Sequence, residues 1–264
     1  MDIFDTHTHY NDKMYDYDIE EIIKKIRKEN VKHFVVIGAT IKESIEACRL
    51  AKKYNEYFSV GVHPDVLPDF LPSSNYANEI YKNIEQLIKE RECIAIGEVG
   101  LDYYGENKDE NNRNIQKEWF IKFINIKKQY NLPLIIHSRD AYNDTYDILE
   151  KFNGRDNNTI IHCYSYDKEL AKKFLNLNYY FGIGGVITFK NAKKLKEAMS
   201  IIPLENIVTE TDCPYLSPEP FRGKRNDSSN IKYIIEAISQ IKEVDKEEVA
   251  KILYNNALRV YNIK

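Results

Sequence analysis

The stretch Phe4-Asp5-Thr6-His7-Thr8-His9 continues an apolar run that begins at Ile3, and it places two of the chain's six histidines two positions apart. Side chains alternate between the two faces of a β-strand, so His7 and His9 point to the same side. Two imidazole rings that face one point form half of a metal site. The alternative is a pair of ordinary histidines on a strand, and the rest of the sequence decides between the two interpretations.

Short apolar runs rich in β-branched residues alternate with amphipathic segments along the whole chain. Their spacing of roughly 30 residues is typical of strand–helix units that build parallel sheets. We expect strands at residues 3–7, 33–37, 58–62, 93–98, 134–137, 159–162, 179–183 and 207–211. We expect helices near residues 19–26, 41–54, 77–90, 114–130, 141–152, 168–177, 191–201, 229–242 and 246–260.

Eight such units, with no Pro- or Ser-rich linker between them, predict a single α/β domain over residues 1–264. The expected fold is a (β/α)8 TIM barrel with an extra C-terminal helix. A doubly wound open sheet is the alternative. The stretch Asp5-Thr6-His7 stands after the first strand, where a glycine-rich phosphate loop would favour that alternative.

The composition limits the classes of function that the chain can have. Hydrophobic residues make up 43% of the 264 residues, and the formal net charge is −3, so no overall basic surface attracts nucleic acid. No apolar run approaches the roughly 20 residues of a membrane span, and the N-terminus lacks the apolar core of a signal peptide. The four cysteines form no CxxC pair and are expected to be reduced thiols. We expect a soluble cytoplasmic protein without a membrane or an obligate protein partner.

Polar side chains follow the apolar runs at the expected strand ends. In a TIM barrel these ends meet at one face, where the chemistry takes place. A histidine or glutamate in such a position costs burial free energy unless it is paired or binds an ion. The side chains concerned are His7, His9, His63, Glu98, His137, His162 and Asp212. The remaining histidine, His33, opens the second strand at the opposite face, and we expect it to be structural.

Six of these side chains form a predicted metal site: His7, His9, Glu98, His137, His162 and Asp212. Six ligands are too many for one zinc ion with an open position, but they suit two divalent ions that share a carboxylate. We expect Glu98 to bridge the ions, with Asp212 and the first-strand histidines on one ion and His137 and His162 on the other. No lysine ends the fourth or fifth strand, so we expect no carboxylated lysine. The expected ions are Zn²⁺, Mn²⁺ or Mg²⁺.

Several motifs follow one another in a fixed order nearly from end to end. They are Phe4-Asp5-Thr6-His7-Thr8-His9, Gly61-Val62-His63-Pro64, Ala95-Ile96-Gly97-Glu98-Val99-Gly100-Leu101-Asp102-Tyr103-Tyr104, Leu134-Ile135-Ile136-His137-Ser138-Arg139, His162-Cys163, Gly184-Gly185, Thr209-Glu210-Thr211-Asp212-Cys213-Pro214-Tyr215-Leu216 and Arg222-Gly223-Lys224-Arg225-Asn226. In this order the chain resembles the TatD family of metal-dependent hydrolases, within the amidohydrolase-type barrels. The resemblance implies a TIM barrel, divalent metals, the six ligands named above and hydrolysis of phosphodiester bonds in DNA.

Two positions depart from the usual family pattern. Tyr166 stands where the family usually has a glycine, and it is expected to narrow the cleft beside the second ion. Asp65 stands where the family often has a histidine, which removes one possible donor to a phosphate.

Other polar residues near the predicted centre have possible roles toward the substrate. Arg139 follows His137 by two positions and is expected to hold a substrate phosphate with two hydrogen bonds, with an ion pair to Asp140 as the alternative. His63 is expected to contact a phosphate or act as a general acid, or instead to support a ligand.

A second set of residues is expected to act around this centre. Asp102 and Glu210 are predicted to orient ligands or Arg139 from behind. Arg222, Lys224 and Arg225 follow the last strand at the same face, and they are predicted to bind the substrate strand. A solvated surface turn is the alternative for this basic run.

The sequence therefore predicts a binuclear metal-dependent deoxyribonuclease, exonuclease-like, that acts on single-stranded or frayed DNA. The catalytic residues would be Asp212, which accepts or orients the proton of an activated water, and Glu98, which holds the two ions together. The first alternative is an ester or amide hydrolase on the same site, such as an aminoacyl-tRNA deacylase. The second is a non-catalytic metal-dependent binding protein, and the complete ligand set argues against it.

Overall fold

The strands lie side by side in one parallel sheet that curves into a barrel. A computed structural model describes residues 1–67, 71–105 and 109–264. The sheet has the order β1 to β8, so each strand pairs with the next strand along the chain. The strands are β1 (Ile3–Thr8), β2 (Val31–Val36), β3 (Tyr57–Val60), β4 (Cys93–Asp102), β5 (Leu134–Arg139), β6 (Thr159–Ile161), β7 (Tyr180–Ile183) and β8 (Ile207–Thr209). This order confirms the predicted TIM barrel and not the doubly wound sheet.

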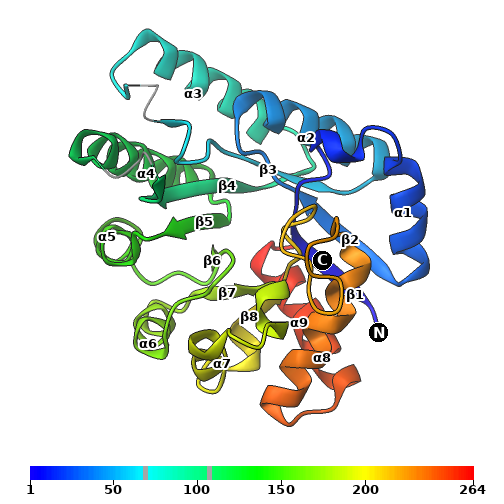
Figure 1. Ribbon diagram of the computed structural model, residues 1–264. Helices are drawn as coiled ribbons and strands as arrows, with labels where there is room; N and C mark the ends of the chain where they lie inside the picture. Colours follow the sequence, from blue (N-terminus) through cyan, green and yellow to red (C-terminus); the bar gives the residue numbers. More distant parts are fainter. Residues whose placement is uncertain (68–70, 106–108) are drawn as a thin grey trace.

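Helices follow the strands and surround the barrel (Figure 1). They are α1 (Ile19–Lys28), α2 (Ile41–Tyr54), α3 (Asn75–Ile88), α4 (Glu110–Tyr130), α5 (Tyr142–Ile148), α6 (Lys168–Asn176), α7 (Lys193–Met199), α8 (Ile231–Lys242) and α9 (Lys246–Val260). The side chain of Thr40 caps α2 by accepting the backbone N–H of Glu43, and that of Asp245 caps α9 in the same way. The extra C-terminal helix, α9, packs against β1 and β8 as expected.

β4 and α5 differ most from the sequence-based prediction. β4 continues past Glu98, because its last residues pair with β5 as far as Asp102, which lies opposite Arg139. The helix expected near residues 141–152 is divided into α5 and a π-helical turn, Leu149–Asn153. The longer β4 carries both Glu98 and Asp102 to the same end of the barrel.

His33 lies within β2, which begins at Val31, and not at the start of the strand. Its ring centre is 5.4 Å from that of Phe4 and 5.5 Å from that of Tyr57. Its Nδ1 atom lies 3.4 Å from Oε2 of Glu56. These contacts agree with the structural role expected for this histidine.

The hydrophobic core fills the barrel and the layer between strands and helices. Trp119, Phe120 and Phe123 of α4 are fully buried, and α4 packs on β4. Burying a phenylalanine side chain stabilises the fold by about 1.5–3 kcal/mol. The packing of α4 therefore stabilises β4, the strand that carries Glu98. Within the described residues, no helix is both long enough and apolar enough to cross a bilayer.

The barrel closes at the seam between β1 and β8, which stand at the two ends of the strand order. The backbone N–H of His9 donates to the carbonyl of Cys213 at 2.8 Å, and that of Asp212 donates to the carbonyl of His7 at 3.0 Å. The hydroxyl of Thr6 donates to the carbonyl of Thr209 at 3.0 Å. These bonds place the segment after β8 directly beside the two N-terminal histidines.

Asp5 supports this seam from inside. Its fully buried carboxylate accepts the hydroxyl groups of Thr211 and Ser228, both at 2.6 Å, and the backbone N–H of Thr211 at 3.0 Å. Burial raises the pKa of Asp5 to about 7, against the opposite effect of these hydrogen bonds. The network joins β1 to Thr211, which precedes Asp212, and to Ser228.

We expect Asp5→Asn to lower the free energy of unfolding by about 1–3 kcal/mol. The NH₂ group of the new amide would face the hydrogen-bond donors of Thr211 and Ser228 and could not accept from them. Denaturant titration of the metal-free protein measures the change. Asp2→Asn is the matched control: the carboxylate of Asp2 is exposed, 3.6 Å from Nζ of Lys32, and its loss should cost below about 1 kcal/mol. Equal stability of both variants would show that the seam does not depend on Asp5.

Candidate metal centre

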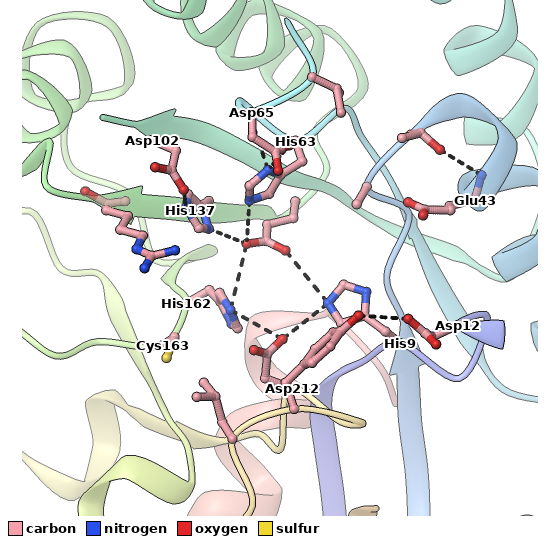
Figure 2. A pocket seen from close by; sticks show the side chains of 18 of the residues that line it. His9, Asp12, Glu43, His63, Asp65, Asp102, His137, His162, Cys163 and Asp212 are labelled. Atoms are coloured by element: carbon pink, nitrogen blue, oxygen red, sulfur yellow. Dashed lines mark hydrogen bonds and ion pairs between the residues drawn. The ribbon is translucent and has the colours of Figure 1, made fainter. Parts of the chain in front are cut away.

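Glu98 lies at the centre of a histidine cluster at the C-terminal ends of the strands. Figure 2 shows four histidines of this cluster, His9, His63, His137 and His162, around the cavity. Its side chain is 5% exposed, and its Oε2 atom lies 3.3 Å from Nε2 of His7. Its Oε1 atom lies 2.6 Å from Nδ1 of His137 and 3.8 Å from Nε2 of His162. The two oxygens therefore face different histidines, which is the arrangement that a bridging carboxylate requires.

A close approach of β4 and β5 brings Glu98 beside His137. Gly100 pairs with His137 in the strand register. A Cβ atom at Gly100 would lie 2.0 Å from the carbonyl oxygen of His137, and the residue has a φ of +144°. Only glycine fits this position, so Gly100 allows the two strands to present their side chains together.

His7, His9 and Asp212 meet on the other side of Glu98. The Nε2 atoms of His7 and His9 are 3.2 Å apart. The Oδ1 atom of Asp212 lies 3.6 Å from Nε2 of His7 and 3.2 Å from Nε2 of His9. The sequence predicts the pairing of the two histidines, and the β1–β8 seam brings Asp212 to them.

Two carboxylates stand behind the other two histidines. Oδ2 of Asp102 lies 2.9 Å from Nε2 of His137, and Oε1 of Glu210 lies 3.0 Å from Nδ1 of His162. Each histidine thus contacts a buried carboxylate with one ring nitrogen and faces the centre with the other. This arrangement fixes the ring orientation and the tautomer of a metal-binding histidine, and it agrees with the orienting role predicted for Asp102 and Glu210.

The position of Glu210 depends on a glycine that the sequence analysis did not single out. A Cβ atom at Gly182 of β7 would lie 2.2 Å from Oε2 of Glu210. Oε1 of Glu210 also accepts the backbone N–H of Cys163 at 2.6 Å. Glu210 therefore holds both the His162 ring and the chain that follows it. Gly182 meets Glu210 only because β7 pairs with β8. The local sequence therefore does not indicate that a small residue is needed at this position.

Opposite charges lie very close together in this cluster. Burial lowers the pKa of His162, but the charges of Glu210 and Glu98 outweigh that effect and raise it to about 10. Burial also lowers the pKa of His137, but hydrogen bonds with Asp102 and Glu98 raise it to about 9. Burial alone would raise the pKa of Glu98, yet the facing histidines hold it well below its usual range. A divalent cation would replace the protons that these histidines hold.

The donor set fits divalent cations. His7, Glu98 and His162 have ligand atoms within 4.8 Å of one another, and so do His7, His9 and Asp212. His137 belongs to a further such group with His63 and Asp102, and it contacts Glu98 directly. Imidazole nitrogens combined with carboxylate oxygens suit Zn²⁺ and Mn²⁺. The structure thus brings together all six predicted ligands.

The cluster opens into a cavity of about 780 Å³ that His63 and Arg139 also line. Nε2 of His63 lies 3.7 Å from Oε1 of Glu98, and its Nδ1 lies 2.5 Å from Oδ1 of Asp65. The guanidinium carbon of Arg139 lies 3.7 Å from the centre of the Tyr104 ring. Among the described residues, no carboxylate is within ion-pair distance of Arg139, so the alternative of a pair with Asp140 is not observed.

The basic run after β8 lies outside this cavity. Arg225 forms an ion pair with Asp18, while the side chains of Arg222 and Lys224 lie over phenylalanine rings. None of the three lines the cavity. Their contact with a longer substrate strand stays a prediction.

Tyr166 packs behind the end of β5 and does not line the cavity. Its hydroxyl donates to the carbonyl of Ser138 at 2.7 Å and lies 3.1 Å from the Ser138 hydroxyl. This side chain therefore supports the segment that carries Arg139 and does not narrow the cleft, contrary to the expectation from the sequence.

Some cavity residues were not singled out from the sequence, notably Asp12, Glu43 and Tyr215. The hydroxyl of Tyr215 donates to Oδ2 of Asp12 at 2.8 Å, and its ring centre lies 6.2 Å from that of His9. The position of Asp12 after β1 was an available signal. Its contact with Tyr215, 203 positions away, was not.

The family model of TatD related DNases matches residues 4–262. The chain belongs to the TatD family of metal-dependent hydrolases. It is 39% identical over 262 residues to the metal-dependent hydrolase YabD of Bacillus subtilis (strain 168), with 99% of each protein covered. It is 32% identical over 267 residues to the metal-dependent hydrolase YcfH of Escherichia coli (strain K12), covering 100% of this chain and 97% of that protein.

Solved structures of TatD proteins have the same fold. The TatD homologue YjjV of Escherichia coli matches with a TM-score of 0.89 at 24% identity, over 99% of this chain and 98% of that one. A TatD family hydrolase of Entamoeba histolytica matches with a TM-score of 0.87 at 21% identity, over 100% and 99%. These matches confirm the barrel, and the family model confirms the resemblance seen in the motifs.

We expect Glu210→Gln to weaken binding of Zn²⁺ or Mn²⁺ by about 10–100-fold, because the neutral amide no longer holds His162 with its charge. Competition with a chromophoric chelator measures the affinity. Glu205→Gln, an exposed change just before β8, is the control and should leave the affinity unchanged. Circular dichroism of both metal-free variants checks folding. Unaltered affinity in a folded Glu210→Gln variant would contradict the orienting role.

Proposed function

We propose that this TatD-family protein is a deoxyribonuclease that uses two divalent ions to hydrolyse phosphodiester bonds at the ends of single-stranded or frayed DNA. The observation that carries the proposal is the division of ligands by Glu98, whose two oxygens face separate histidines. Two ions held by such a carboxylate would supply an activated water and would neutralise charge at the attacking and leaving oxygens. The description of the matching family, TatD related DNase, supports DNA as the substrate.

The ligands divide between the two proposed ions as the sequence analysis predicts. Asp212 and the two first-strand histidines would hold one ion, and His137 and His162 would hold the other. Glu98 would contact both, because it lies between the two sets. Asp102 and Glu210 hold their histidine partners in place.

Asp212 is the best placed group to accept a proton. Its side chain is 17% exposed, against 5% for Glu98, so it reaches the cavity more fully. Burial alone would raise the pKa of Asp212, but the hydrogen bond with His9 and the charge of His162 lower it. Asp212 is therefore ionised and able to accept the proton of a water near the centre. Glu98, which histidines surround, serves to hold the ions.

Arg139 and His63 form the substrate side of the proposed site. An arginine can hold a phosphate with two parallel hydrogen bonds, and Arg139 has no competing carboxylate among the described residues. His63 lies beside Glu98 and also faces the cavity, where it can contact the reacting phosphate. Local contacts of this kind suit a chain whose net charge is −3.

We expect Asp212→Asn to lower kcat on DNA by about 10²–10⁴-fold, because it removes a proton acceptor and an ionised ligand. End-labelled single-stranded and duplex DNA, assayed with Mn²⁺ beside ester and amide substrates, gives both the rate and the substrate class. Asp140→Asn is the matched control, since Asp140 also has a positive φ and is exposed. Near-normal turnover by Asp212→Asn would refute its role, and turnover of esters or amides alone would refute the nuclease.

We expect the protein to bind two ions per chain at saturation, and Glu98→Gln to lose at least one of them. Binding should strengthen as the pH rises, because ions displace protons from His137 and His162, whose pKa values are raised. Elemental analysis after gel filtration measures the stoichiometry, and calorimetry in two buffers measures proton release. Saturation at one ion, with no change in Glu98→Gln, would contradict the bridge.

A further inference from the structure

The walls of the metal cavity differ in charge. Arg139, at the end of β5, is the one lysine or arginine among the described residues that line the cavity. Two carboxylates lie on the side formed after β1 and β2, and we call them the acidic wall: Asp12 and Glu43. Because β1 and β2 lie across the barrel from β5, a substrate at the metal centre has a cation on one side and the acidic wall on the other.

The acidic wall has no basic partner among the described residues. Asp12 accepts hydrogen bonds from the hydroxyl of Tyr215 and the backbone N–H of Met14, at 2.8 and 2.7 Å. Asp65, the cavity carboxylate after β3, is not part of the wall, because it is paired with His63. Glu43 is exposed in the first turn of α2. The wall thus presents negative charge to the cavity, and Figure 2 shows Asp12 and Glu43 on the His9 side of the centre, away from His137 and Asp102.

Arg139 is held in a fixed plane on the opposite side. Its guanidinium stacks on the Tyr104 ring at 3.7 Å, and Tyr104 is itself 55% exposed. The segment before it is anchored, because Tyr166 donates to the carbonyl of Ser138. A stacked arginine keeps its N–H groups available at the edge of the plane, where a phosphate can bind.

We propose that this unequal charge selects the substrate. Arg139 binds the phosphate that neighbours the scissile phosphate on one side. On the other side of the scissile bond, the acidic wall accepts only a nucleoside unit that carries no further phosphate. The inference rests on the proposed phosphodiester hydrolysis. It deepens it by assigning a specificity role to Asp12 and Glu43.

Electrostatics gives the reason for this selection. The metal centre neutralises the scissile phosphate, and Arg139 neutralises one neighbour. A second neighbouring phosphate placed against the acidic wall would meet like charges, which repel it at close range. A terminal nucleoside unit with a free hydroxyl escapes this repulsion. Cleavage is then confined to one end of a strand, and a phosphate on that end is rejected.

The test compares short single-stranded oligonucleotides that carry a hydroxyl or a phosphate at the 5′ end or at the 3′ end, with Mn²⁺ present. We expect a phosphate at one of the two ends to lower kcat/KM by about tenfold or more, equivalent to about 1.4 kcal/mol, and a phosphate at the other end to have little effect. Glu43→Lys should reduce that discrimination at least several-fold. Glu46→Lys is the matched control, because it makes the same charge change on α2 at a residue outside the cavity.

A second substrate isolates the role of Arg139. Bis(p-nitrophenyl) phosphate has a scissile phosphate but no neighbouring one, so Arg139→Gln should lower kcat/KM on it much less than on an oligonucleotide. The inference is overturned if terminal phosphates have no effect, if Glu43→Lys and Glu46→Lys behave alike, or if Arg139→Gln affects both substrates equally. In those cases hydrolysis of bis(p-nitrophenyl) phosphate leaves the proposed function standing. If neither substrate is hydrolysed, the proposed function and the inference both fall.

Discussion

A carboxylate buried among imidazole rings is the constraint on which the rest of this structure depends. Removing the charge of Glu98 from water costs several kcal/mol unless groups of opposite charge replace the solvent. The histidines that do so come from β1, from β5 and from the segment after β6. The cluster can therefore exist only when distant parts of the chain meet at one point. A closed barrel provides this, because the C-terminal ends of all its strands converge on one face.

The hydrogen bonds that close the barrel between β1 and β8 also hold residues of the proposed metal centre together. The buried Asp5 binds the backbone and side chain of Thr211, next to Asp212. The backbone of Asp212 in turn bonds to His7. A distortion of the seam would thus separate His7 from Asp212, two ligands of the proposed metal centre. Two glycines also allow close packing at the centre. Gly100 leaves room for the carbonyl group of His137, and Gly182 leaves room for the carboxylate of Glu210.

The chemistry of the centre and its choice of substrate depend on different parts of the barrel. Strand ends supply Arg139 and the proposed ligands, while the loops after them supply Asp12 and Tyr104. Loops can change without loss of the strand pairing that holds the centre. In this TatD-family protein the residues around the centre carry unequal charge, and among the described residues a single lining arginine, Arg139, would direct the proposed substrate.

The sequence by itself determined the barrel and the converging ligands, because strand–helix alternation and polar residues at strand ends are local patterns. His7 and His9 share a face through the strand period alone. Tertiary structure alone decided how the two oxygens of Glu98 divide the histidines, and that the space beside Gly182 holds the carboxylate of Glu210. It also placed Glu43 in an acidic wall and paired Arg225 with Asp18. Such contacts join residues far apart in the chain. The local periodicity of the sequence does not indicate which segments will face one another once the barrel closes.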